Sequence, residues 1–319
     1  MDDFLSARCS GFARAEGLDP GGTAGSYGGV VAVEMPLPWP REITEDPALV
    51  PVAPALAAAG LRVQGLAPDP DRAPGDRRRM LTFLRPDGPF AGYRPAAWEV
   101  PAGDVTAALG ALAAAAAGAG GDVAAAGPAT LVAAGADVGR HVLVCTHGRR
   151  DACCGTLGTR LALALPGLGA GVRTWRTSHT GGHRFAPTAV LLPEGTAWAY
   201  LDPDSLVGIV DRTLDLDEAA RRYRGCSGLD GPEVQAAERE ALRAVGWGWL
   251  DRARTGTVVA REGGRTLVRL EATGAGAAAI AFEAVVEVAR LVPVPECGKP
   301  PEQAPKSAPE LRVASFAAA

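Results

Sequence analysis

The segment HVLVCTHGRRDACCGTLGTRLALAL at residues 141–165 opens with a short apolar strand at 141–145 and, after a loop, continues with the apolar spacing of a helix. Residues 171–177 predict a second strand, and residues 188–192 and 196–201 predict a hairpin around a Pro-Glu-Gly turn. The resulting order is β-α-β-β-β. This stretch therefore predicts a mixed α/β (α+β) domain in the centre of the chain.

Strands and helices also alternate on the N-terminal side of this segment. Apolar patterning predicts strands at 28–36, 61–66, 80–85 and 90–100 and helices at 47–59 and 104–117. A Gly-rich run at 118–121 ends the last helix. We therefore expect an N-terminal α/β domain over residues 1–138 and a central domain over residues 139–230.

The C-terminal side has a different pattern. Helical stretches at 204–223 and 232–245 precede a hairpin at 256–262 and 265–271 and a further strand at 279–288. These elements predict a small β-rich appendage over residues 231–297. Residues 298–319 are rich in Pro, Ala and charge, so we expect a disordered tail.

Bulk composition excludes several classes of protein. Apolar residues make up 47% of the 319 residues and charged residues 21%, which is ordinary for a globular chain. Apolar runs are shorter than a membrane span, and no secretory signal is visible, so the expected location is the cytoplasm. The net charge of −4 argues against a nucleic-acid or membrane-surface binder.

Two cysteines and two histidines lie in two tight pairs. Eight residues separate Cys145 from Cys154, and three separate His179 from His183. Two thiolates and two imidazoles suit either a Rieske-like [2Fe-2S] cluster or a tetrahedral zinc ion. The residue types alone leave both alternatives open.

Gly181 and Gly182 lie between the two histidines. They disfavour a helix and leave a flexible loop whose backbone amides can wrap inorganic sulfide. A cluster needs such close approach more than zinc does.

The motifs CTHGRRDACCG at 145–155 and HTGGHRF at 179–185 resemble those of the sucrase/ferredoxin-like family, whose members carry C(T/S)H-G-x-RD-x-(x)-C-G and HxGGHRF segments. The resemblance is specific over residues 141–201 and looser over residues 9–100, where GTA and EMPLPW are similar to the family's N-terminal pattern. Beyond residue 230 no resemblance is visible.

The resemblance implies a thioredoxin-like ferredoxin fold for the central domain. It also implies that Cys145, Cys154, His179 and His183 ligate a [2Fe-2S] cluster. Neutral histidine ligands would favour the reduced cluster and raise its potential above that of plant-type ferredoxins. The second nitrogen of each imidazole would couple reduction to a proton.

Several neighbouring residues have open roles. Cys153 adjoins Cys154 and is the alternative ligand, but we favour Cys154, directly before a glycine, and expect Cys153 to be a buried thiol. His147 and Arg184 are candidates for contacts around the cluster, and the competing interpretation for His147 is an ordinary loop histidine. The remaining cysteines, which are isolated in sequence, are expected to be buried or incidental thiols: Cys9, Cys226 and Cys297.

Between residues 141 and 184 six arginines face one acid, Asp151. The arginines are Arg149, Arg150, Arg160, Arg173, Arg176 and Arg184. This excess would stabilise a reduced cluster or dock an acidic partner; the alternative is a solvated charged face.

The sequence therefore predicts a one-electron, proton-coupled carrier rather than a catalyst with its own substrate, served by a reductase and passing electrons to an acceptor. An alternative is a structural Cys2His2 zinc module that mediates interactions. Sugar hydrolysis, which the family name suggests, needs a facing pair of carboxylates, and none stands out near the motifs.

Overall fold

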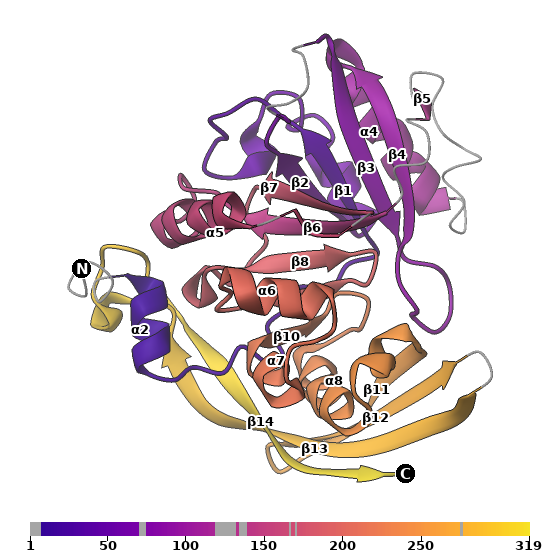
Figure 1. Ribbon diagram of the computed structural model, residues 1–319, viewed down its shortest axis with the longest axis vertical. Helices are drawn as coiled ribbons and strands as arrows, with labels where there is room; N and C mark the ends of the chain where they lie inside the picture. The colour runs from indigo at the N-terminus through magenta and orange to yellow at the C-terminus, as the bar shows by residue number, and fades with distance from the viewer. Residues whose placement is uncertain are drawn as a thin grey trace.

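The computed structural model describes residues 8–69, 75–118, 132–133, 139–165, 167–169, 171–274 and 277–319. Figure 1 shows a large sheet with helices beside it and a smaller sheet built from the C-terminal part of the chain. The predicted mixed α/β class is confirmed.

The large sheet contains ten strands among the described residues, in the order β10-β9-β8-β6-β7-β2-β1-β3-β4-β5. Their bounds are β1 (Gly29–Glu34), β2 (Leu61–Leu66), β3 (Arg77–Leu84), β4 (Arg94–Pro101), β5 (Val132–Ala133), β6 (Arg140–Cys145), β7 (Val172–Thr177), β8 (Ala189–Leu192), β9 (Thr196–Trp198) and β10 (Tyr223–Cys226). β1 and β6 are almost wholly buried, as their continuous apolar runs predict.

The sheet consists of two halves with the same arrangement of strands. In the first half β1 is parallel to β2 and antiparallel to β3, which pairs with β4. In the second half β6, β7, β8 and β9 repeat this pattern. The halves meet where Leu66 of β2 lies opposite Thr177 of β7. The predicted boundary at residue 138 lies outside the described residues, and the strands on its two sides share one sheet.

The described α-helices are α2 (Cys9–Ala15), α3 (Ala53–Ala58), α4 (Val105–Gly118), α5 (Thr159–Ala164), α6 (Pro203–Val210), α7 (Leu216–Arg222) and α8 (Pro232–Val245). The stretch at 204–223 forms two helices, because Arg212 takes a positive φ of 59° and Asp215 caps the backbone of Glu218. Within the described part of the chain, no helix has the length and apolar content needed to cross a membrane.

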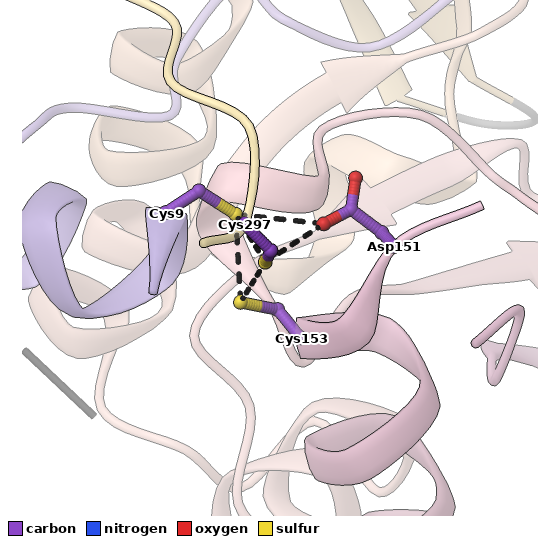
Figure 2. Close-up of side chains that lie close together, drawn as sticks. All are labelled: Cys9, Asp151, Cys153 and Cys297. Atoms are coloured by element: carbon purple, nitrogen blue, oxygen red, sulfur yellow. Dashed lines mark hydrogen bonds between the residues drawn. The ribbon is translucent and has the colours of Figure 1, made fainter. Parts of the chain in front are cut away.

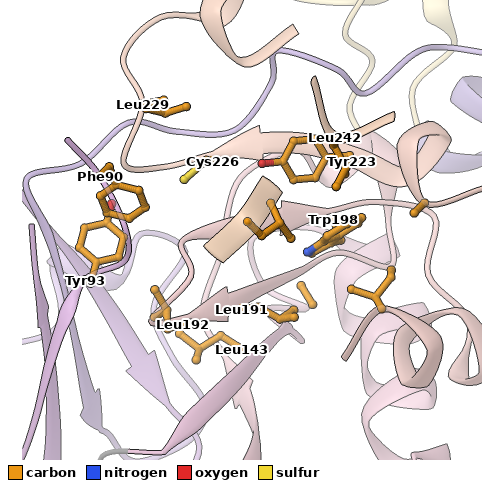
Figure 3. Close-up of a cluster of buried hydrophobic side chains, with 14 of the residues drawn as sticks. Phe90, Tyr93, Leu143, Leu191, Leu192, Trp198, Tyr223, Cys226, Leu229 and Leu242 are labelled. Carbon is orange, nitrogen blue, oxygen red and sulfur yellow. The ribbon is translucent and has the colours of Figure 1, made fainter. Parts of the chain in front are cut away.

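The main core extends along both halves of the large sheet and reaches α8 and the smaller sheet. Figure 3 shows part of it, including Leu143 of β6, Leu191 of β8 and Leu242 of α8. Trp198 and Tyr223 pack with their ring centroids 4.9 Å apart. Tyr223 donates a hydrogen bond of 2.8 Å to Glu238, which also forms a fully buried ion pair of 2.6 Å with Arg254. This polar network joins β10 and α8 to the first strand of the smaller sheet.

The smaller sheet has the order β11-β12-β13-β14. Its strands are β11 (Ala253–Glu262), β12 (Arg265–Gly274), β13 (Ala277–Pro293) and β14 (Ser307–Ala318). The predicted disordered tail is therefore wrong, since β14 pairs antiparallel with β13 over most of its length. The composition of the tail suggested disorder, but a long partner strand satisfies its backbone groups.

Candidate metal centre

Strands β6 and β7 bring the two sequence motifs to one edge of the sheet. Cys145 ends β6 and pairs with Thr177, which ends the parallel strand β7. When parallel strands end in register, the loops that follow them begin at the same edge of the sheet. His179 comes two residues after Thr177, so this topology places it next to Cys145.

Cys154 returns to the same edge through a tight loop and a turn of π-helix, η3 (Cys154–Gly158). A Cβ on Gly158 would lie 1.8 Å from the carbonyl oxygen of Cys145, and one on Gly155 would lie 2.4 Å from Cα of Gly148. Only glycines permit this approach. Such π-helical turns are frequent at functional sites.

Three of the four predicted ligands come together. The ligand atoms of Cys145, Cys154 and His179 lie within 4.8 Å of one another. Both cysteines are fully buried, and Nδ1 of His179 is buried without a hydrogen-bond partner among the described residues. Two thiols and an imidazole form a donor set for a soft metal centre, so these residues fit a cluster or a zinc ion.

The two thiols of this group shift each other's pKa in opposite directions. A hydrogen bond from Cys154, together with one from His179, lowers the pKa of Cys145. The same bond to Cys145, with burial, raises the pKa of Cys154. The first cysteine is therefore the thiolate of the pair, and metal binding would require the second to release its proton.

The fourth predicted ligand, His183, lies beside this group with different contacts. Its Nδ1 is 2.9 Å from Oδ2 of Asp151 and 3.3 Å from Sγ of Cys9. Its ring centroid is 6.2 Å from that of His179. With Nδ1 bonded to Asp151, Nε2 is the nitrogen that remains for a metal.

The loop between the histidines depends on both glycines and on a buried arginine. Gly181 and Gly182 have φ angles of 85° and 68°. Arg224 donates to the carbonyl of Gly181 at 3.2 Å, and a Cβ on Gly182 would lie 2.5 Å from its Cζ. Burial lowers the pKa of Arg224 to about 10. Sequence analysis missed this arginine because no motif marks it.

His147 and Arg184 both lie close to the site. Nδ1 of His147 accepts the backbone N–H of His179 at 3.2 Å, and its Nε2 donates to the carbonyl of Pro40 at 2.8 Å. Burial lowers the pKa of His147. Arg184 is buried with its guanidinium 4.7 Å from the centroid of Phe185. His147 therefore positions the backbone of a ligand, and Arg184 packs inside the fold.

The arginine excess is partly neutralised. Arg150 pairs with Glu42, and Arg173 pairs with Asp69. Arg184 is buried, while Arg149 and Arg160 are exposed. The six arginines therefore do not form one continuous basic surface.

Two of the cysteines expected to be incidental are not isolated. Cys9 and Cys297 lie 3.4 Å apart at their sulfur atoms, and both contact Cys153. Cys9 is a buried thiol, as expected, but neither residue is isolated in space, because the fold joins segments from both ends of the chain. Hydrogen bonds from Cys297, Cys9 and Ser10 lower the pKa of Cys153 to about 3. Cys226 is a separate buried thiol in the core.

Comparison with known proteins agrees with the motifs. A family model described as sucrase/ferredoxin-like matches residues 20–225. The chain is 34% identical over 94 residues to "Altered inheritance of mitochondria protein 32" of Meyerozyma guilliermondii. That alignment covers 26% of this chain and 33% of the relative, so the chain spans a third of the relative's length. No solved structure gives a significant match.

Proposed function

The chain belongs to the sucrase/ferredoxin-like family, and from that premise we propose that it is a one-electron carrier with a [2Fe-2S] cluster held by Cys145, Cys154, His179 and His183. The observation that carries the proposal is the group of two buried thiols and the imidazole of His179, whose Nδ1 is buried and has no hydrogen-bond partner in the part of the chain that the structure describes. A buried, unpartnered polar nitrogen is costly unless a ligand satisfies it.

When bound, such a cluster takes up and releases single electrons, and its histidine ligands raise its potential above that of an all-cysteine ferredoxin. The surrounding residues orient the ligands. His147 accepts the backbone N–H of His179, and Arg62 donates to the carbonyl of the same residue at 2.8 Å. These contacts hold the backbone of His179 between the loop after β6 and strand β2, one from each half of the sheet.

A proton has a defined place in this arrangement. Nδ1 of His183 lies 2.9 Å from Oδ2 of Asp151, so an imidazole that binds metal through Nε2 holds its proton between the ring and the carboxylate. The proposed carrier is therefore proton-coupled. Its proposed partners are a reductase and an electron acceptor in the cytoplasm, and the exposed Arg149 and Arg160 suit an acidic partner surface.

The test is iron and sulfide analysis with a visible spectrum after anaerobic purification. Wild-type protein should contain iron and sulfide and absorb visible light. Cys145→Ser and Cys154→Ser should each lose the absorbance, because a hard hydroxyl is a poor ligand for a cluster. Cys226→Ser is the matched control, since this buried thiol lies in the main core, and it should keep the absorbance. Cys153→Ser changes a thiol that contacts a different group, and its effect should be far milder than that of either ligand variant.

Two results would overturn the proposal. Zinc in place of iron, with no visible absorbance, would identify a zinc interaction module. Loss of absorbance in Cys153→Ser with retention in Cys154→Ser would show that the ligand assignment is wrong.

A further inference from the structure

Three cysteines outside the proposed cluster site meet a carboxylate beside it (Figure 2). Cys9 comes from α2, Cys297 from the loop after β13, and Cys153 and Asp151 from the loop that leads into η3. Their sulfur atoms and the carboxylate point toward one another.

The distances describe a compact, four-cornered group. Sγ of Cys9 lies 3.4 Å from Sγ of both Cys153 and Cys297, and the latter two are 3.0 Å apart. Oδ1 of Asp151 is 3.1 Å from Sγ of Cys297 and 3.6 Å from Sγ of Cys9.

A tetrahedral ion about 2.3 Å from each sulfur separates the sulfurs by about 3.8 Å. To reach that spacing, the two sulfur pairs that include Cys9 would open by about 0.4 Å and the Cys153–Cys297 pair by about 0.8 Å. A cluster would spread its ligands over several iron atoms, so the compactness favours a single ion.

Burial and donor chemistry point to the same conclusion. Cys9 and Cys153 are 2% and 0% exposed, and the side chain of Asp151 is 9% exposed. A buried carboxylate is unfavourable unless hydrogen-bond donors or a cation compensate its charge. His183 bonds Oδ2, and a metal ion would compensate Oδ1, which faces the thiols. Calcium and magnesium prefer oxygen ligands, whereas three thiolates and one carboxylate suit tetrahedral zinc.

We propose that Cys9, Cys153, Cys297 and Asp151 form a closed structural zinc site. Four protein ligands leave no position open for substrate, as in structural zinc sites generally. Ser10 donates a hydrogen bond of 3.1 Å to Sγ of Cys153, and His183 bonds the second oxygen of the carboxylate, so the ligands are oriented from outside.

The zinc ion fastens both ends of the described chain to the loop that carries Cys154. Cys9 and Cys153 are 144 positions apart, and Cys9 and Cys297 are 288 positions apart. Asp151 contacts the thiols through Oδ1 and His183 through Oδ2, so this site also braces a proposed cluster ligand. The inference does not depend on what the other site binds.

The experiment measures zinc and iron separately in full-length protein prepared with zinc. Wild type should hold one zinc ion per chain in addition to whatever metal the other site binds. Cys9→Ser and Cys297→Ser should each lose this zinc ion. Cys297→His keeps a side chain that can bind zinc, so it should retain the ion. Its zinc content would show that the serine variants do not lose zinc through misfolding. Cys145→Ser should lose iron and keep zinc, and Cys226→Ser should keep both.

Cobalt and thiol labelling provide readouts that do not depend on activity. Cobalt(II) in place of zinc should give thiolate charge-transfer absorption that Cys9→Ser lacks. A chelator should make the half-buried Cys297 reactive to maleimide. Unchanged zinc in both serine variants, or a Cys153–Cys297 disulfide in protein isolated with zinc, would overturn the proposal.

Discussion

At the scale of single residues, the two histidines of the HTGGH motif differ in their surroundings. His179 is held by its backbone, which bonds His147 and Arg62, and its Nδ1 is unpartnered among the described residues. His183 is held by its ring, through Asp151. The fold therefore positions one histidine of the motif through its backbone and the other through its ring.

Replacing either His179 or His183 by Cys should lower the reduction potential. The new thiolate adds a negative charge that opposes the incoming electron. The wild-type potential should fall as pH rises, by at most about 59 mV per unit for one proton per electron. Each variant should lose part of that slope. Protein-film voltammetry across a pH series measures both quantities.

Cys226→Ser is the control for this experiment, because its thiol lies in the main core. It should leave the potential and the slope unchanged. Histidine variants with wild-type potentials would show that these residues are not ligands.

At the scale of elements, the contact between η3 and the end of β6 forms the site. Replacing Gly158 by Ala should disrupt that contact, since its Cβ would lie 1.8 Å from the carbonyl oxygen of Cys145. Forced overpacking of this kind costs about 1–3 kcal/mol. Urea unfolding should show the loss of stability, and iron content should fall with it.

Gly103→Ala is the matched control, because a Cβ at that helical glycine would have no heavy atom of the described residues within 4 Å. It should leave the unfolding midpoint nearly unchanged. Equal stability of the two variants would mean that η3 moves away from β6 without cost, and that this contact does not define the site.

At the scale of the whole molecule, a buried ion pair joins the two sheets. Arg254 of β11 and Glu238 of α8 are both fully buried, and burial raises the pKa of Glu238. Glu238→Gln would leave the arginine charge buried and uncompensated, and arginine cannot release its proton. Equilibrium denaturation should show a loss of about 3–5 kcal/mol.

Asp251→Asn gives the comparison, since it breaks an ion pair with Arg212 in which the two side chains are 30% and 61% exposed. Exposed pairs contribute less than about 1 kcal/mol. Suppose that both variants lost the same small free energy of unfolding. The buried ion pair would then not be what holds the smaller sheet against the core.

Local patterns in the sequence were sufficient for most elements. Strand β2 and helix α8 have the bounds that their apolar spacing predicts, because alternation and helical periodicity are properties of neighbouring residues. Strand β14 was missed for the opposite reason. Its composition has no strong strand pattern, and its pairing with β13 supplies the order.

The site, too, was predicted in part from local sequence patterns and formed in part by tertiary contacts. The sequence by itself determined the family motifs and the pairs Cys145 with Cys154 and His179 with His183, because spacing within one loop is visible in the sequence. Only the tertiary structure decided that Cys9 and Cys297 meet Cys153, and that Arg224 lies under the histidine loop. Contacts between residues 144 or 288 positions apart leave no periodic signal, since they arise from how the sheets and helices pack.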